Sequence, residues 1–339
     1  MRTFKELRFL GMVMFLLAAL TVCSQSRQDV ENTINIIKHR KQYPHYVLVS
    51  AHRGYWADYP ENSLNAYRMA MDIGADIIEM DVRLTKDDEM VVFHDACLDR
   101  VTTGYGRLRE EAWSYVSSLF LKKEDGTVTT DKVLKLSEAL DFLKDKAVIA
   151  LDIKESGKLF DATMIRVLQM LKSKSMLWQS IVKGKMRLPV LQQNVLQPTS
   201  LTLDDFIYTP IAFSTTSDLA TYVYEFTACG KIYAMEMVYK QSNDAIIDFL
   251  SGIHNAGIWI GQYSFWPETG EGVIAEKIPL TDTDPIIRKY DFKDQDPTNF
   301  LDDGRGDWDW LFLQGASYVI TDRSELLIEY LTKRGRRIK

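Results

Sequence analysis

The stretch that decides the fold is VLVSAHRGYWADYPENSLNAYRMAMDIGADIIEMDV, residues 47–82. Its first five and last seven residues form mainly apolar runs that are typical of strands. Between them, Asn62–Ile73 predicts a helix, because Asn62 or Ser63 can cap its start and Gly74 follows its end. A strand, a helix and a second strand in this order predict a βαβ unit with a parallel pair of strands.

The same alternation continues to the end of the chain. Helical patterns separate nine strand candidates, which are Val47–Ala51, Asp76–Val82, Met90–Phe93, Ala147–Ile153, Ile181–Lys183, Phe206–Phe213, Ile232–Met237, Gly257–Ile260 and Tyr318–Thr321. A closed barrel needs eight strands, so the sequence predicts the α/β class and a (β/α)₈ TIM barrel with one accessory strand. A doubly wound open sheet is the alternative, but no glycine-rich nucleotide fingerprint follows the first strand to support it.

We expect a single barrel domain over residues 45–339, preceded by a linker and an outer helix over residues 24–44. Two long connections, Asp95–Thr130 and Phe265–Asp307, are expected as loop elaborations on the C-terminal face of the barrel, where active sites lie. The composition is that of a globular enzyme, with 26% charged and 46% hydrophobic residues. The net charge of −6 gives no electrostatic basis for binding nucleic acid.

The first 23 residues have the outline of a secretory signal, in which basic residues precede a short apolar run, Phe9–Leu20. The stretch Leu20–Cys23 resembles a bacterial lipoprotein processing site, which would make Cys23 the lipidated residue, and plain cleavage near this point is the alternative. We therefore expect an exported protein, either periplasmic or tethered to the membrane through Cys23. The other cysteines, Cys97 and Cys229, are expected to be free thiols rather than a disulfide.

Polar side chains that can carry chemistry follow or interrupt the first strands. His52 follows the first strand candidate and His94 follows the third. Glu79 and Asp81 interrupt the second, two residues apart, so they point to the same side of the strand. Two neighbouring carboxylates in an apolar strand are costly unless a cation neutralises them, and a hard divalent cation is a natural partner.

The strand Ala147–Ile153 adds a third carboxylate, Asp152, on the same face as Lys154. Together with Arg53, Lys154 and a metal ion would create a positive field that suits a phosphate group. Each residue alone is compatible with a structural ion pair or hydrogen bond. Their occurrence together at the ends of consecutive strands favours a catalytic site with two histidines as acid and base.

The residues from 51 to 104 resemble the glycerophosphodiester phosphodiesterase family. The motifs that carry this resemblance are Ala51–Gly54, Pro60–Ser63, Gly74–Val82, Thr85–Asp87, His94-Asp95, Leu98–Arg100 and Thr102–Gly104, with thinner matches at Leu136–Ala139, Leu151–Lys154 and Tyr318–Asp322. No motif of the family is found over residues 155–230.

The resemblance implies a TIM barrel that hydrolyses small glycerophosphodiesters to glycerol 3-phosphate and an alcohol with one Ca²⁺ or Mg²⁺. It implies His52 and His94 as the acid–base pair. The implied metal ligands are Glu79, Asp81 and Asp152, and the implied phosphate ligands are Arg53 and Lys154, with Glu61 supporting the site. One histidine would activate a hydroxyl of the substrate's glycerol, and water would then open the resulting cyclic phosphate.

The sequence departs from the family pattern in two places that bear on the site. Asp152 replaces the usual Glu, as it does in related cyclising phospholipases. The stretch Ile258–Gln262 replaces a Trp-Thr-Val-Asn motif, which predicts Trp259 as an aromatic wall for the substrate and Gln262 as a changed polar partner. Glu236 is either a further contact to the substrate or metal, or a paired structural residue. A cyclising phospholipase acting on intact lipids and a non-catalytic phosphodiester-binding lipoprotein are the alternative functions.

Overall fold

The computed structural model describes residues 27–264, 305 and 308–337. The expected signal segment, Cys23 and nearly all of the connection Phe265–Asp307 lie outside these residues. None of the helices in the described part of the chain is long and apolar enough to cross a membrane.

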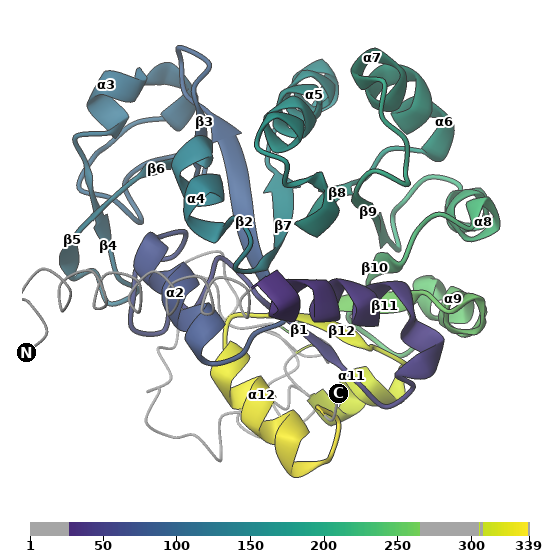
Figure 1. Ribbon diagram of the computed structural model, residues 1–339. Helices are drawn as coiled ribbons and strands as arrows, with labels where there is room; N and C mark the ends of the chain where they lie inside the picture. The colour runs from purple at the N-terminus through teal and green to yellow at the C-terminus, as the bar shows by residue number, and fades with distance from the viewer. Residues whose placement is uncertain (1–26, 265–304, 306–307, 338–339) are drawn as a thin grey trace, which may run out of the picture.

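Eight parallel strands form the closed barrel that the sequence predicts (Figure 1). They are β1 (Leu48–Ala51), β2 (Ile77–Leu84), β7 (Val148–Ile153), β8 (Ser180–Gly184), β9 (Ile207–Phe213), β10 (Ala234–Val238), β11 (Trp259–Ser264) and β12 (Tyr318–Thr321). The barrel closes because β1 pairs with both β12 and β2. The open-sheet alternative is therefore excluded.

Helices surround the barrel, and many follow the strand that precedes them in the chain (Figure 1). They are α2 (Leu64–Asp72), α4 (Leu136–Leu143), α5 (Gly157–Ser173), α6 (Leu188–Leu191), α7 (Gln197–Thr199), α8 (Leu219–Cys229), α9 (Leu250–Ala256), α11 (Trp308–Leu313) and α12 (Ser324–Lys333). Ser63 caps α2 as predicted, because its Oγ accepts a hydrogen bond from the Ala66 backbone N–H at 3.1 Å.

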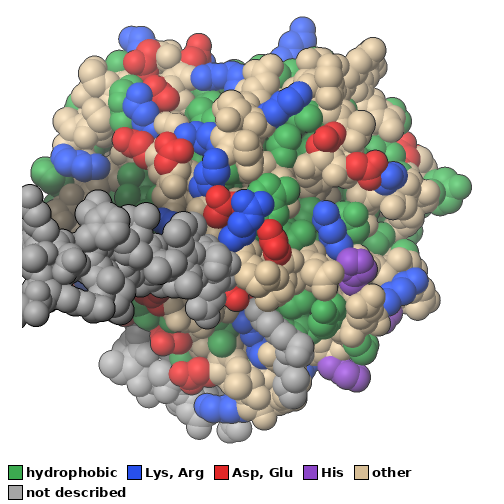
Figure 2. All heavy atoms as spheres, viewed as in Figure 1, with side chains coloured by type: hydrophobic (Ala, Val, Ile, Leu, Met, Phe, Trp, Pro, Cys, Tyr) green, Lys and Arg blue, Asp and Glu red, His purple; other side chains and the backbone are tan. Residues whose placement is uncertain are grey.

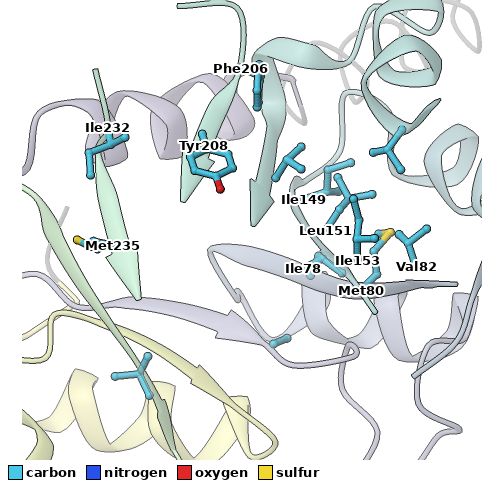
Figure 3. Close-up of a cluster of buried hydrophobic side chains, with 14 of the residues drawn as sticks. Ile78, Met80, Val82, Ile149, Leu151, Ile153, Phe206, Tyr208, Ile232 and Met235 are labelled. Carbon is cyan, nitrogen blue, oxygen red and sulfur yellow. The ribbon is translucent and has the colours of Figure 1, made fainter. Parts of the chain in front are cut away.

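The outward-facing side chains of the strands pack under these helices and form the main core. Figure 3 shows part of it, where alternate residues of β2 and β7, such as Ile78 and Ile149, gather in the same layer. This alternation leaves every second residue of each strand facing the barrel axis.

The accessory strand is β3 (Met90–Val92), which pairs antiparallel with β2 outside the barrel. The segment after it, expected as a loop, contains α3 (Trp113–Val116) and three short strands, β4 (Phe120–Lys122), β5 (Val128–Lys132) and β6 (Leu134–Lys135). This segment has its own small apolar core, around residues such as Leu98 and Leu119, which explains why it is ordered. Cys97 and Cys229 are free thiols, as predicted.

The N-terminal end of the barrel is filled by apolar side chains. A helix over residues 27–38 covers this end, and its Val30, Ile34 and Ile37 pack against inward-facing residues at the strand starts (Figure 1). Figure 2 shows charged side chains of both signs spread over the face seen in Figure 1 rather than gathered into one patch. Because apolar side chains and the helix over residues 27–38 fill the N-terminal end, the closed end of the barrel, we expect the site for a polar substrate at the other end.

Candidate active site

Carboxylates replace apolar residues toward the C-terminal ends of β2 and β7. Along the inward face of β2 the order is Ile77, Glu79 and Asp81, and Asp152 is the register partner of Asp81 on β7. Glu79 and Asp81 are fully buried, and Asp152 is partly buried. Each residue offers a carboxylate oxygen that lies within 4.8 Å of those of the other two. The structure thus brings together the three predicted metal ligands.

The turn after β1 fixes Glu79. Arg53 has a left-handed backbone (φ 57°), and its N–H donates to Glu79 Oε2 at 3.0 Å. Gly54 follows at φ 81°, where a Cβ atom would lie 2.9 Å from the Ala66 backbone, so the turn requires glycine. The other oxygen of Glu79 faces the ammonium of Lys183 at 3.4 Å. Both carboxylate oxygens of Glu79 are therefore held by the protein.

Two predicted phosphate ligands lie against the carboxylates. Lys154 Nζ is 2.8 Å from Asp152 Oδ2 and 3.0 Å from Asp81 Oδ1, and the Arg53 guanidinium is 3.4 Å from Asp81 Oδ2. Burial alone would raise the pKa of Asp81, but the charges of Lys154, both predicted catalytic histidines and Arg53 bring it well below its usual value. The site therefore keeps Asp81 ionised at neutral pH.

His52 lies at the end of β1 and is buried. Its Nδ1 is 2.6 Å from Asp322 Oδ1, and the same oxygen accepts a hydrogen bond from Trp56 Nε1 at 3.1 Å. A carboxylate at Nδ1 favours the tautomer that has its proton on Nδ1 and directs Nε2 away from Asp322. Asp322 thus orients His52 in the way that carboxylates orient catalytic histidines.

His94 is more exposed and follows the accessory strand rather than a barrel strand. Its Nδ1 is 2.7 Å from Asp95 Oδ1. Asp95 also binds the Arg100 guanidinium, which makes two further hydrogen bonds of 2.7 and 2.8 Å to Glu61. Glu61 in turn contacts Arg53 at 3.3 Å. A chain of polar contacts therefore connects His94 to Arg53, the predicted phosphate ligand.

The carboxylate cluster fits a divalent cation. Its donors are all oxygens, which Ca²⁺ and Mg²⁺ prefer, and Asp81 Oδ1 is buried without a hydrogen-bond donor of good geometry. Among the described residues that form ion pairs around it, six carboxylates face four arginine and lysine groups, and His94 adds a cation only when it is protonated: Glu61, Glu79, Asp81, Asp95, Asp152 and Glu236 against Arg53, Arg100, Lys154 and Lys183. A bound divalent cation would balance this excess of negative charge.

A cavity of about 280 Å³ opens beside these residues. His52, Asp152 and Lys154 line it, together with Tyr263 and Arg305. The cavity is large enough for a phosphate group and small organic substituents, and it places a histidine, a carboxylate and an ammonium group around one ligand. Its remaining described lining residues are Lys185, Ile211, Phe213, Val238, Ser264 and Asp322.

Trp259 does not reach this cavity, which corrects its predicted role as a substrate wall. It is the first residue of β11, is fully buried at the closed end, and donates from Nε1 to the Ile37 carbonyl at 2.8 Å. Gln262 is also buried away from the cavity, where it donates to the Tyr239 carbonyl at 2.9 Å. The aromatic residues that line the cavity are Tyr263 and Phe213.

Glu236 is a paired residue. Its Oε1 is 3.2 Å from Lys183 Nζ, and its Oε2 accepts a hydrogen bond from the Tyr263 hydroxyl at 2.9 Å. Since Lys183 also faces Glu79, these residues form a support beneath the carboxylate cluster. Burial would lower the pKa of Lys183, but Glu236, Tyr263 and Glu79 raise it well above its usual value.

From the sequence alone, no role in the site was predicted for Lys183, Tyr263, Arg100, Asn62 or Asp322. Asn62 donates to Asp81 Oδ2 at 2.9 Å. Lys183 carried a usable signal, because it lies two residues after Ile181 and therefore on the inward face of the same strand. Asp322 and Arg100 lie inside quoted motifs, but their partners are distant in sequence and could not be paired without the fold.

Comparison with known proteins places this geometry in a family. Residues 52–263 match the model of the glycerophosphoryl diester phosphodiesterase family. The chain is 33% identical over 127 residues to a glycerophosphodiester phosphodiesterase of Caldanaerobacter subterraneus, an alignment that covers 37% of this chain and 52% of the relative. It is 32% identical over 116 residues to one of Bacillus altitudinis, covering 33% and 46%. The matched part thus spans about half the length of these relatives.

Solved structures share the fold over most of the chain. The crystal structure of a glycerophosphoryl diester phosphodiesterase from Parabacteroides distasonis superposes with a TM-score of 0.66 at 18% identity, covering 90% of this chain and 92% of that one. An Oleispira antarctica phosphodiesterase, in complex with the product sn-glycerol-3-phosphate, gives 0.56 at 16% identity, covering 86% and 98%. The family model matches more than half of the sequence, and the chain belongs to the glycerophosphoryl diester phosphodiesterase family.

Proposed function

We propose that this protein hydrolyses glycerophosphodiesters to glycerol 3-phosphate and an alcohol, with one divalent cation as cofactor. The observation that carries the proposal is the pair of histidines at one acidic cluster. Each histidine is oriented through Nδ1 by its own carboxylate, and both are close enough to Asp81 to contribute to its lowered pKa. The family membership and the product complex of the Oleispira antarctica phosphodiesterase support the same reaction class.

The two histidines would exchange protons with the substrate at their Nε2 atoms. In the first half-reaction, one histidine takes the proton of a glycerol hydroxyl as its oxygen attacks phosphorus. The other gives a proton to the departing alcohol oxygen, which leaves a cyclic phosphate. In the second half-reaction the roles are reversed, because water loses a proton as it attacks and the ring oxygen regains one. Each half-reaction conserves protons and charge.

Glu79, Asp81 and Asp152 would hold the cation, with Arg53 and Lys154 directed at the phosphate. A bound divalent cation would polarise the phosphoryl oxygens and favour ionisation of the attacking hydroxyl. Arg53 is fixed by Glu61 and Asp81, so its guanidinium keeps one orientation as charge develops on phosphorus. Glu61 is itself held by two arginines, which lower its pKa against the effect of burial.

Product analysis by ³¹P NMR tests this proposal. The metal-loaded enzyme is incubated with sn-glycero-3-phosphocholine and with sn-glycero-3-phosphoglycerol, and we expect the glycerol 3-phosphate resonance to replace that of the diester. A cyclic phosphate as the final product would identify a cyclising enzyme, consistent with the shorter Asp152. Binding of the diester without conversion would support the non-catalytic alternative, which the presence of both histidines and all three carboxylates argues against.

We further propose that the protein acts outside the cytoplasm. The support is the order of basic residues, the apolar run Phe9–Leu20 and Cys23 in the sequence. Lipidation of Cys23 would tether the barrel to a membrane, whereas cleavage near this point would release it. Metabolic labelling with a palmitate analogue distinguishes these outcomes, because only the tethered form incorporates label and loses it in the Cys23→Ser variant.

A further inference from the structure

A second cavity, of about 410 Å³, lies beside the catalytic cavity. It is formed by the end of β7, the start of α5 and the residues that follow β8. Asp152, Lys185 and Ile211 line both cavities. A ligand bound at the carboxylate cluster can therefore extend past Asp152 into the second cavity.

The wall of the second cavity is mainly apolar. Ile153, Phe160, Met186 and Ile211 supply aliphatic, aromatic and thioether surfaces. Phe160 is partly buried and packs against the main core, so its ring is held in place rather than free in solvent. These surfaces suit methyl and methylene groups rather than a sugar or a second phosphate.

Carboxylates face the same space. Asp161 Oδ2 accepts a hydrogen bond from Asn194 Nδ2 at 2.8 Å, and Glu155 Oε1 accepts one from the Leu84 N–H at 3.1 Å. These bonds hold both side chains at the wall of the cavity.

The cationic residue among the described lining residues is Lys185. Its Nζ lies 4.8 Å from the centre of the Phe213 ring, which lines the catalytic cavity and not the second one. The lining of the second cavity thus combines an aromatic ring and apolar surface with Glu155 and Asp161, besides Asp152 of the carboxylate cluster, against the lysine Lys185. This combination is complementary to an ammonium group that carries short alkyl substituents.

We propose that the second cavity binds the alcohol part of the substrate and selects amino alcohols, with a quaternary ammonium preferred over a neutral polyol. The proposal rests on the function proposed above. The face of the Phe160 ring would contact the ammonium group, and Asp161 would balance the positive charge of that group. Phosphate would remain at Arg53 and Lys154, so the second cavity determines which diester is used and not the chemistry of its cleavage.

The test compares kcat/KM for sn-glycero-3-phosphocholine and sn-glycero-3-phosphoglycerol. We expect the choline ester to be preferred. Cation–π and charge contacts of ~1–2 kcal/mol correspond to about 5- to 30-fold, so Phe160→Ala and Asp161→Asn should each lower kcat/KM for choline by that factor. The kcat/KM for the glycerol ester should change less than twofold in either variant. Asp204→Asn, which alters an exposed carboxylate paired with Lys231, is the matched control and should change neither.

Equal kcat/KM values for the two esters in the wild type, or equal losses of kcat/KM for both esters in Asp161→Asn, would overturn the proposal. A binding experiment keeps this outcome separate from failure of the proposed function. Calorimetry with phosphocholine and with glycerol 3-phosphate measures affinity without turnover. If the wild type cleaves neither ester but Asp161→Asn still weakens the binding of phosphocholine and not that of glycerol 3-phosphate, the cavity is assigned correctly and the hydrolase function is wrong.

Discussion

The two ends of the barrel are built from the same strands with opposite chemistry. At the N-terminal end the inward-facing residues are apolar, and the helix over residues 27–38 covers them. At the C-terminal end the same faces of β2 and β7 carry Glu79, Asp81 and Asp152. A step of two to four residues along a strand separates the two environments. One sheet can thus support a stable core and a charged site, because each end is occupied by its own layer of side chains.

The difference also separates stability from activity. The closed end gains from removal of apolar surface from water. The charged end buries carboxylates and cations, whose desolvation cost is offset only while every partner is present. We therefore expect changes at the mouth to affect catalysis or pH dependence, and to lower stability where a buried charge loses its partner. Changes at the closed end should affect stability alone.

The largest expected effect is at the histidines. His52→Ala and His94→Ala should each lower kcat by ~10²–10⁴, the usual contribution of a general acid or base. His254→Ala is the control, because His254 contacts Arg40 at 3.1 Å away from the mouth and should leave kcat unchanged. Steady-state kinetics on a chromogenic phosphodiester measures all three. Wild-type rates in either of the first two variants would refute the acid–base assignment.

Substitution of Lys183 tests whether the buried carboxylates at the mouth need their cationic partner for the stability of the fold. Lys183→Met leaves Glu79 and Glu236 buried without their ammonium partner, and should lower the free energy of unfolding by roughly 3–5 kcal/mol. Lys174→Met removes a cation paired with the exposed Asp141 and should cost less than ~1 kcal/mol. Urea unfolding measures both. Equal small losses would show that Lys183 does not stabilise the cluster.

The lowered pKa of Glu61 predicts how the stability of the fold depends on pH. Its pKa is lowered in the folded protein, so its ionised form stabilises the fold above its unfolded pKa of ~4.3, and this contribution is lost as pH falls through the folded value. Glu61→Gln should cost roughly 3 kcal/mol at pH 7 and flatten the loss of stability below about pH 4. Thermal unfolding from pH 7 to pH 3 measures this. A variant curve parallel to that of the wild type would contradict the ion-pair account.

The smallest expected effect is at the closed end. Trp259→Phe removes the hydrogen bond to the Ile37 carbonyl and should cost about 1–3 kcal/mol, with kcat unchanged. Thermal unfolding and kinetics on the same preparation provide both values. A tenfold loss of kcat at full stability would reverse the comparison, since it would place Trp259 in the catalytic part of the molecule.

Sequence reasoning predicted the barrel and the residues of its mouth because both depend on local periodicity. Inward-facing carboxylates on an apolar strand are visible at a spacing of two. The role of Trp259 was wrong because it was carried over from the family's Trp-Thr-Val-Asn motif, whereas β11 begins at Trp259 and its side chain lies at the closed end. The partners of His52 and Glu79 are Asp322 and Lys183, which only the closed barrel brings near.

We propose that the carboxylate cluster holds a catalytic divalent cation. Calorimetric titration of the EDTA-treated protein with Ca²⁺ and Mg²⁺, followed by assay of the same samples, tests it most directly. We predict one ion per chain, no turnover before addition and recovered turnover after it. Glu79→Gln should weaken binding by at least ~10–100-fold, the loss found even for outer partners of metal ligands. Full turnover in EDTA, or unchanged metal affinity in Glu79→Gln, would contradict the account.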